Sequence, residues 1–515
     1  MRTQNSIKNI GMSIFSQVVI TLLGFVSRKV FIDSLGIEYL GVNALLINVL
    51  SMMALVEGGI GISITYNLYK PLADNDRYKI IALIQLYRKT YRILALIILL
   101  ISICIYPLLG HFIKDASKIP YLPTIYFLFV FKNMISYFNA HKWTLIQADQ
   151  KGYILARMEL LFQVVVTFIK IWILIVTHNY ILYLAIELIV LVFQNIVNGI
   201  IVDRKYQYLK TSVKHDVDVS TKDNIIKNIK ALFLHNVGSY LVFGTDSLLI
   251  SSFISIAVVG FYSNYTMLLG QLSGILSPIL SGIGASIGNL IATESSEKNY
   301  SIFKITYLVN FWLFSIIVIF LYNVLEPFIN WWLGSGFLLD HRTYMLILVN
   351  FYLTGMRTSI ATFKTRAGLF VQDKYVPIIE GILNLIASLV LLRYFDLAGI
   401  FMGTTISTIV TVFWTQPLIV YKNIFKKSIW LYFAKYGVYA VLTILTCIVT
   451  SYVGQSIVVG NSLVSIIVRG LICITIPNLI YVCLFYKTKE FQYLYQVLKQ
   501  YVSSKRRPKI DSYQV

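Results

Sequence analysis

Long, nearly unbroken runs of apolar residues alternate with short polar segments along the whole chain. A helix needs about 20 apolar residues to cross roughly 30 Å of hydrocarbon, and each run is long enough to do so. The pattern predicts fourteen transmembrane helices near residues 10–32, 40–68, 93–113, 119–140, 154–176, 180–202, 231–256, 257–292, 304–326, 343–363, 376–395, 397–421, 434–456 and 462–485.

Two of these spans, 40–68 and 257–292, are longer than the bilayer requires. We expect each to be strongly tilted, bent at its glycines or extended beyond the membrane. The first span is too long for the apolar core of a signal peptide, and no small-residue cleavage site follows it. It is therefore predicted to be retained.

Composition and charge agree with a membrane protein. The chain is 57% hydrophobic and only 13% charged, against about 25% charged residues in average soluble domains. With the N-terminus inside, the cytoplasmic segments hold 33 of the 44 Lys and Arg residues and the outside loops hold 4. The positive-inside rule then places both termini in the cytoplasm. The same asymmetry accounts for most of the net charge of +21 without a nucleic acid partner.

The chain also contains an internal repeat. The shift that carries Ile7 onto Ile226 places the sequence IKNI at 7–10 on IKNI at 226–229, and it places Gly41 on Gly260. Six spans separate the two copies, so both halves have the same orientation, and a pseudo-twofold along the membrane normal should relate them. The predicted domains are an N-lobe (1–202), a cytoplasmic basic linker (203–230), a C-lobe (231–421), an extra helix pair (422–486) and a cytoplasmic basic tail (487–515), which is amphipathic or disordered.

Motifs for catalysis are missing from the sequence. The four cysteines and six histidines have no metal-ligand spacing, and no phosphate loop, HExxH helix or GxSxG turn occurs. A polysaccharide polymerase would need a substantial outward domain, whereas the longest outside loop, 327–342, is short. We therefore predict a transporter, without cofactor or metal, rather than an enzyme.

Four short segments resemble a known family: SRKVFI at 27–32, LGIEYLGVN at 35–43, EGGIG at 57–61 and LYKPLA at 68–73. They are similar to Wzx-type polysaccharide transporters of the multidrug/oligosaccharidyl-lipid/polysaccharide exporter superfamily. The motif match covers mainly the first seventy residues. Span count, repeat and extra helix pair agree with the family over the whole chain.

The resemblance implies a flippase in a bacterial cytoplasmic membrane that moves undecaprenyl-pyrophosphate-linked oligosaccharide to the outer leaflet by alternating access, for capsule, O-antigen or exopolysaccharide synthesis. Its partners would be that lipid-linked oligosaccharide, membrane lipids, a polysaccharide polymerase and glycosyltransferases. The last two helices would form a groove for the lipid tail. The alternatives are a cation-coupled drug exporter, which the thirteenth and fourteenth spans disfavour, and a lipid II flippase.

Twelve charged residues lie three or more residues inside the ends of the predicted spans. Each costs about 2.5 to 3.5 kcal/mol near the centre of a helix that faces lipid. Lys29, Arg157, Glu159 and Glu380 lie near span ends and can extend to the interface. The deeper cations are candidates for binding a pyrophosphate, although each could instead pair with an acid between helices. These candidates are Arg28, Lys132, Lys170, Arg357 and Arg469.

Two acids, Asp246 and Glu57, are candidates for a gate or an ion-coupling element. The repeat shift sets Asp246 and Ser247 in register with Ser27 and Arg28, so an acid and a base should lie at similar depths in the two lobes. An ordinary buried acid is the alternative. Glu57 should not touch Arg28, because the two lie roughly 25 Å and 6 Å from the outer ends of their helices at 1.5 Å per residue.

Overall fold

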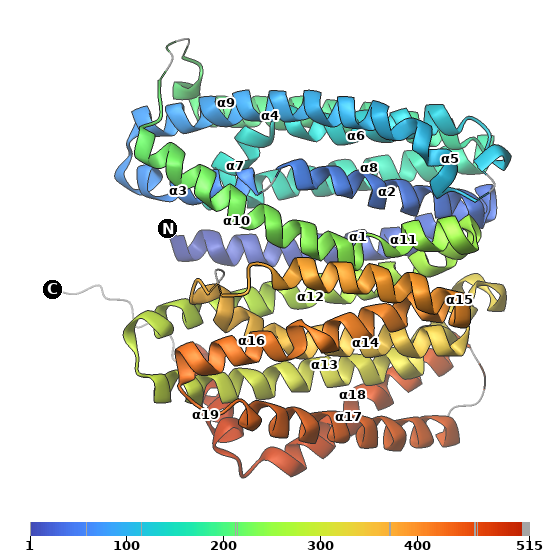
Figure 1. Ribbon diagram of the computed structural model, residues 1–515, viewed down its shortest axis with the longest axis vertical. Helices are drawn as coiled ribbons and strands as arrows, with labels where there is room; N and C mark the ends of the chain where they lie inside the picture. Colours follow the sequence, from blue (N-terminus) through green and yellow to red (C-terminus); the bar gives the residue numbers. More distant parts are fainter. Residues whose placement is uncertain are drawn as a thin grey trace. The chain divides into compact units, whose positions relative to one another are not determined.

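The computed structural model describes residues 2–57, 59–114, 116–211, 213, 215–369, 372–457, 460 and 462–506, and no β-strand occurs among them. Figure 1 colours the chain from the N-terminus in blue to the C-terminus in red and labels its helices. They are α1 (Arg2–Leu35), α2 (Ile37–Glu57), α3 (Ile60–Asp74), α4 (Arg77–Ile105), α5 (Leu109–Phe112), α6 (Leu122–Phe138), α7 (Ala140–Ala148), α8 (Tyr153–Thr177), α9 (Tyr180–Lys205), α10 (Val219–Phe243), α11 (Asp246–Leu249), α12 (Ile256–Thr293), α13 (Ser296–Leu333), α14 (His341–Arg366), α15 (Val376–Val410), α16 (Val412–Val420), α17 (Trp430–Ile457), α18 (Leu463–Phe485) and α19 (Lys489–Arg506).

The helices are of the membrane-spanning kind. Within the described residues, eight helical stretches are long and apolar enough to cross a bilayer, and Ile37–Met53 and Leu122–Phe138 are shorter apolar helices. The all-helical membrane class is therefore confirmed, whereas the count of fourteen spans is not.

Helix breaks occur where the sequence permits unusual backbone angles. The overlong second span ends one helix at Glu57 and begins another at Ile60, with Gly59 in the left-handed region at φ 79°. Glycine adopts this conformation without the steric cost that a Cβ adds. The helical stretch Val376–Val410 is interrupted at Asp396 (φ 48°, ψ −132°), the residue between the predicted eleventh and twelfth spans.

Contacts divide the chain into two compact units. Unit 1 comprises Met1–Leu280 and Lys374–Ser407, and unit 2 comprises Ser281–Asp373 and Thr408–Val515. In unit 1, α8 packs on α1 and α9; in unit 2, α14, α17 and α18 pack on α13 (Figure 1). The predicted boundary between lobes, at 203–230, falls inside unit 1, and the lobe boundaries stay a prediction.

The internal repeat coincides with matching helix ends in unit 1. Helix α2 begins at Ile37 and α12 begins at Ile256, and the repeat shift carries the first of these starts onto the second. A Cβ added to Gly41 would lie 2.0 Å from the carbonyl oxygen of Ile256, and one added to Gly260 would lie 2.5 Å from that of Ile37. Each contact is the repeat equivalent of the other. A twofold relation between the repeats produces this reciprocity, because the same surface meets itself.

The first helix of each repeat also packs on the second helix of the other. The Thr21 hydroxyl on α1 donates to Gln271 Oε1 on α12 at 2.7 Å. In the other direction, Tyr240 of α10 donates to the carbonyl oxygen of Asn48 in α2 at 3.1 Å. The two repeats are therefore interlocked within unit 1 and do not fold as separate bodies there.

Replacing Gly260 with alanine is expected to destabilise the protein by about 1 to 3 kcal/mol, because the new methyl group forces α2 and α12 apart. Gly270 on the same helix has open space beyond its Cα, so Gly270→Ala is the matched control and should be neutral or stabilising. Thermal unfolding of the purified protein in detergent measures both. Equal melting temperatures for the two variants would contradict the close contact.

The basic tail begins as an amphipathic helix, α19, attached to unit 2. Glu490 pairs with Lys304 at 3.4 Å and with Lys435 at 3.9 Å, and the Phe491 ring stacks on Trp312. Burial opposes ionisation of Glu490, but a backbone hydrogen bond and the two lysines outweigh it, so its pKa lies below the usual value. Residues 507–515 of the predicted tail lie outside the described residues.

Candidate functional site

Arg28 is held by polar side chains of α12 in unit 1. Its Nη1 donates to Ser263 Oγ at 2.9 Å and to Asn264 Oδ1 at 3.0 Å. Asn264 is fully buried, and its Nδ2 has no hydrogen-bond partner within the described part of the chain. Arg28 thus satisfies one end of a buried amide, and both of these bonds use a single nitrogen of its guanidinium group.

Asp246 begins the short helix α11 and lies beside the same stretch of α12. Tyr262 donates to its Oδ2 at 3.4 Å, while the buried Oδ1 has no hydrogen-bond partner among the described residues. Within the described residues, no ion pair joins Asp246 to Arg28. The two side chains instead contact neighbouring residues of α12: Asp246 contacts Tyr262, and Arg28 contacts Ser263 and Asn264. A coupling between the two would therefore pass through this segment, and the predicted gate stays a prediction.

Glu57, the last residue of α2, lies in a cluster of tyrosines. Tyr91 of α4 donates to its Oε1, and the Tyr91 ring packs edge-on against Tyr87 and beside Tyr137. Arg28, by contrast, contacts α12. Sequence spacing did not reveal the tyrosines, which come from two separate helices, α4 and α6.

Lys132 and Lys170 share one carboxylate. Glu187 of α9 pairs with Lys132 of α6, and with Lys170 of α8 at 2.8 Å. Lys170 also lies 4.1 Å from the centre of the Tyr183 ring. Two cations facing one acid leave a net charge of +1 in this triad, so the electrostatic attraction for a phosphate is smaller than two free lysines would provide. Their predicted role in substrate binding stays a prediction.

The other two candidate cations lie in unit 2, apart from this group in the sequence. Arg357 of α14 is an electrostatic neighbour of Tyr432 and Tyr436. Arg469 of α18 donates from Nη2 to the carbonyl oxygen of Gly460 at 3.3 Å. Of the predicted substrate-binding residues, the structure brings together the two lysines of the triad in unit 1.

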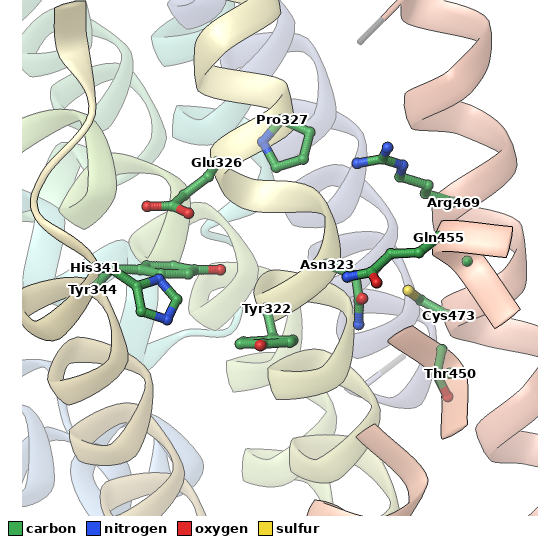
Figure 2. Close-up of a pocket in the computed structure, with 11 residues that line it drawn as sticks. Tyr322, Asn323, Glu326, Pro327, His341, Tyr344, Thr450, Gln455, Arg469 and Cys473 are labelled. Atoms are coloured by element: carbon green, nitrogen blue, oxygen red, sulfur yellow. The ribbon is translucent and has the colours of Figure 1, made fainter. Parts of the chain in front are cut away.

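Arg469 lines a polar pocket of about 190 Å³ between α13, α14, α17 and α18. Figure 2 shows its guanidinium on one side, near Gln455, and the carboxylate of Glu326 on the other, near His341. Thr450 is fully buried, and its hydroxyl has no hydrogen-bond partner in the described part of unit 2. The pocket therefore offers charge of both signs and an unmet hydroxyl.

An apolar groove of about 650 Å³ adjoins this polar pocket and shares Tyr322 and Gln455 with it. Most of its lining comes from α13, α14 and α17. From Tyr436 to Gln455 it follows α17, over roughly 28 Å at 1.5 Å per residue. A groove of this length and character can hold a long hydrocarbon chain, with the polar pocket at one end.

A buried ion pair in unit 2 was not predicted from the sequence. Lys364, at the end of α14, pairs with Asp373, and both side chains are almost fully buried. The two residues lie close together in the sequence, both within the predicted cytoplasmic loop 364–375. Their opposite charges at a short separation were the available signal.

The N-terminal half of the chain matches a family profile described as Polysaccharide biosynthesis protein, over residues 6–283. The chain belongs to this family. The match includes Arg28, Glu57 and Asp246, and it extends well beyond the four motif segments. No curated protein matches the chain significantly.

Solved structures share the fold of this polysaccharide biosynthesis protein. The lipid II flippase MurJ in an inward closed conformation matches with a TM-score of 0.65 and 14% identity, over 93% of this chain and 99% of that one. The Vibrio cholerae MATE transporter VcmN matches with a TM-score of 0.59 and 13% identity, over 84% and 99%. A MOP superfamily transporter from Pyrococcus furiosus matches with a TM-score of 0.54 and 14% identity, over 83% and 96%. At these identities the likeness concerns the fold, which is the all-helical fold of these transporters.

Proposed function

We propose that this protein flips undecaprenyl-pyrophosphate-linked oligosaccharide from the cytoplasmic to the outer leaflet for surface polysaccharide synthesis. Membership of the polysaccharide biosynthesis family and a fold shared with a lipid II flippase support transport of a glycan on a lipid carrier. Both termini lie in the cytoplasm in this proposal, as the 33 to 4 charge asymmetry indicates.

The observation that carries the proposal is the apolar groove of unit 2. The length of this groove is close to the thickness of the bilayer hydrocarbon. A polyprenyl chain can fill an apolar groove of this length, whereas a soluble drug or an ion does not need one. Arg469 in the adjoining polar pocket provides a planar cation that suits phosphate oxygens. Arg28 in unit 1 provides a second such cation.

The groove can be blocked without changing any charge. Ala440 lines it, whereas Val441 is exposed on the same helix outside it. We expect Ala440→Trp to slow flipping of the lipid-linked oligosaccharide in proteoliposomes by at least about tenfold, equivalent to roughly 1.4 kcal/mol. Val441→Trp is the matched control and should leave the rate unchanged.

Two outcomes would contradict the proposal. Equal rates for Ala440→Trp and the wild type would show that the groove does not hold the substrate. Wild-type vesicles that export a cationic dye but do not flip the lipid would favour the drug exporter.

A further inference from the structure

Unit 1 contains a second polar pocket, whose lining does not include Arg28, Lys132, Lys170 or Glu187. It has a volume of about 190 Å³ and lies between the adjoining ends of α6, α7, α8 and α9. Its polar and aromatic lining consists of Ser136, Trp143, Gln147, Glu159, Gln194, Asn195 and Asn198. Three of these residues lie on the last turns of α9, and the predicted basic linker 203–230 follows them.

The pocket has hydrogen-bonding capacity that the protein does not use. Asn198 is 6% exposed, and its Oδ1 has no hydrogen-bond partner in the part of unit 1 that the structure describes. Leaving a buried polar atom unpaired costs about 1 to 3 kcal/mol. A ligand that supplies a donor to this oxygen would remove that penalty.

Asn195 fixes the position of this part of α9. Its Nδ2 donates to the carbonyl oxygen of Ile135 at 3.0 Å, and its Oδ1 accepts from Asn139. These bonds tie α9 to the end of α6. Asn198 lies one turn further along α9, so these bonds also fix the helix segment that carries it.

The composition of the pocket selects a class of ligand. Among the described residues that line it, none is a lysine, arginine or histidine and one is a carboxylate, Glu159, so a phosphate would be repelled. Amide and carboxylate groups supply both acceptors and donors for hydroxyl groups. The indole of Trp143 offers a flat face and an N–H. Neutral, hydroxyl-rich rings combine the two properties that this lining recognises.

The size of the pocket limits the ligand to a small group. Pockets that enclose drug-sized ligands have volumes of about 300 to 1,000 Å³. This pocket, at about 190 Å³, is smaller than that range. One sugar ring is a better match than a complete oligosaccharide repeat unit. The remaining sugars would extend beyond the pocket.

We infer that this pocket is a sugar subsite that binds one ring of the glycan at the cytoplasmic end of α6, α8 and α9. The inference rests on the proposed function, because it assigns part of the substrate to these residues. Trp143 stacks on the ring, Asn198 and Glu159 bind its hydroxyls, and Gln147 and Gln194 close the pocket. The subsite makes transport selective for the glycan rather than for the carrier lipid.

The test compares binding with transport in the purified full-length protein. The binding probe is the soluble oligosaccharide released from the host's carrier lipid. Trp143→Ala and Asn198→Leu should each raise its Kd about tenfold, whereas Trp143→Phe should keep most of the affinity because it keeps an aromatic face. Trp172 is 65% exposed on α8, and Trp172→Ala is the matched control with an unchanged Kd.

Transport in proteoliposomes separates this inference from the proposed function. Trp143→Ala should slow flipping of the glycan-bearing lipid and leave flipping of undecaprenyl pyrophosphate without sugar unchanged. If the wild type flips the glycan-bearing lipid but all variants bind the oligosaccharide equally, the subsite is wrong and the flippase stands. If the wild type binds the oligosaccharide through Trp143 but flips neither lipid, the subsite stands and the flippase is wrong. Binding of choline in place of the oligosaccharide would assign the pocket to an ammonium ligand and overturn the inference.

Discussion

Arg28→Ala is expected to abolish export of surface polymer in cells while the protein remains in the membrane at its normal level. The substitution removes the cation that we propose binds the pyrophosphate, and a lysine at this position should restore export only in part. An ammonium keeps the charge but loses the planar fork that binds two phosphate oxygens together. Polymer measured at the cell surface, alongside the amount of membrane-inserted protein, tests this expectation.

The contacts of Arg28 provide the control for a purely structural role. Arg28→Ala also leaves the buried Asn264 without its donor, at a cost of about 1 to 3 kcal/mol. The double variant Arg28→Met with Asn264→Leu removes both polar groups and should recover stability without recovering export. Export at the wild-type rate in either variant would exclude Arg28 from the phosphate site.

Glu187→Ala is expected to have the largest effect on stability. It leaves Lys132 and Lys170 facing each other without their shared carboxylate. The three side chains are only 13 to 31% exposed, and loss of one partner costs up to about 3 to 5 kcal/mol in a fully buried ion pair. Because many proteins have a total stability of only about 5 to 15 kcal/mol, most of the variant should fail to accumulate. Fluorescence size-exclusion chromatography of a tagged protein measures the folded fraction.

Two further variants make the Glu187 prediction specific. Adding Lys170→Met to Glu187→Ala removes the more buried cation and should restore much of the folded protein. Asp33 pairs with Lys29 on the surface of unit 1, with 63% of its side chain exposed, so Asp33→Ala should cost no more than about 1 kcal/mol. If Glu187→Ala and Asp33→Ala accumulate equally, the triad does not stabilise the fold.

Much of the fold follows from the apolar pattern because the membrane forces long apolar runs to be helices. The repeat also proved informative: the shift that carries Ile37 onto Ile256 links α2 to α12, and it pairs Gly41 with Gly260, which lie at the same helix contact. The span count could not be confirmed by the same reasoning. The predicted span 40–68 is broken at Gly59, which has a positive φ. Hydropathy averaged over a window of residues does not detect such a break.

The candidate site was only partly accessible to sequence reasoning. Depth along the helices predicted that Glu57 and Arg28 do not touch, and the two side chains have different hydrogen-bond partners. The same argument could have paired Lys170 with Glu187, which lie at similar depths from the outer ends of consecutive antiparallel spans. The hydrogen bonds of Arg28 to α12 could not be predicted, because they depend on which face α12 turns toward α1. Pockets formed by four helices, such as that around Asn198, likewise require the packing itself.

The reciprocal contact of Gly41 and Gly260 has a consequence for how the protein is made. Gly41 packs on Ile256, which leaves the ribosome much later, after the rest of the first repeat and the basic linker. At about 5 to 20 residues per second, the delay is on the order of 10 to 40 seconds. During that interval we expect α1 and α2 to be in the membrane while Gly41 still lacks its packing partner. The polar groups of these two helices, including Arg28, await helices not yet synthesised. The newly inserted first half is therefore a natural client for an insertase or a quality-control protease, and ribosome stalling between residues 74 and 256 should expose it to both.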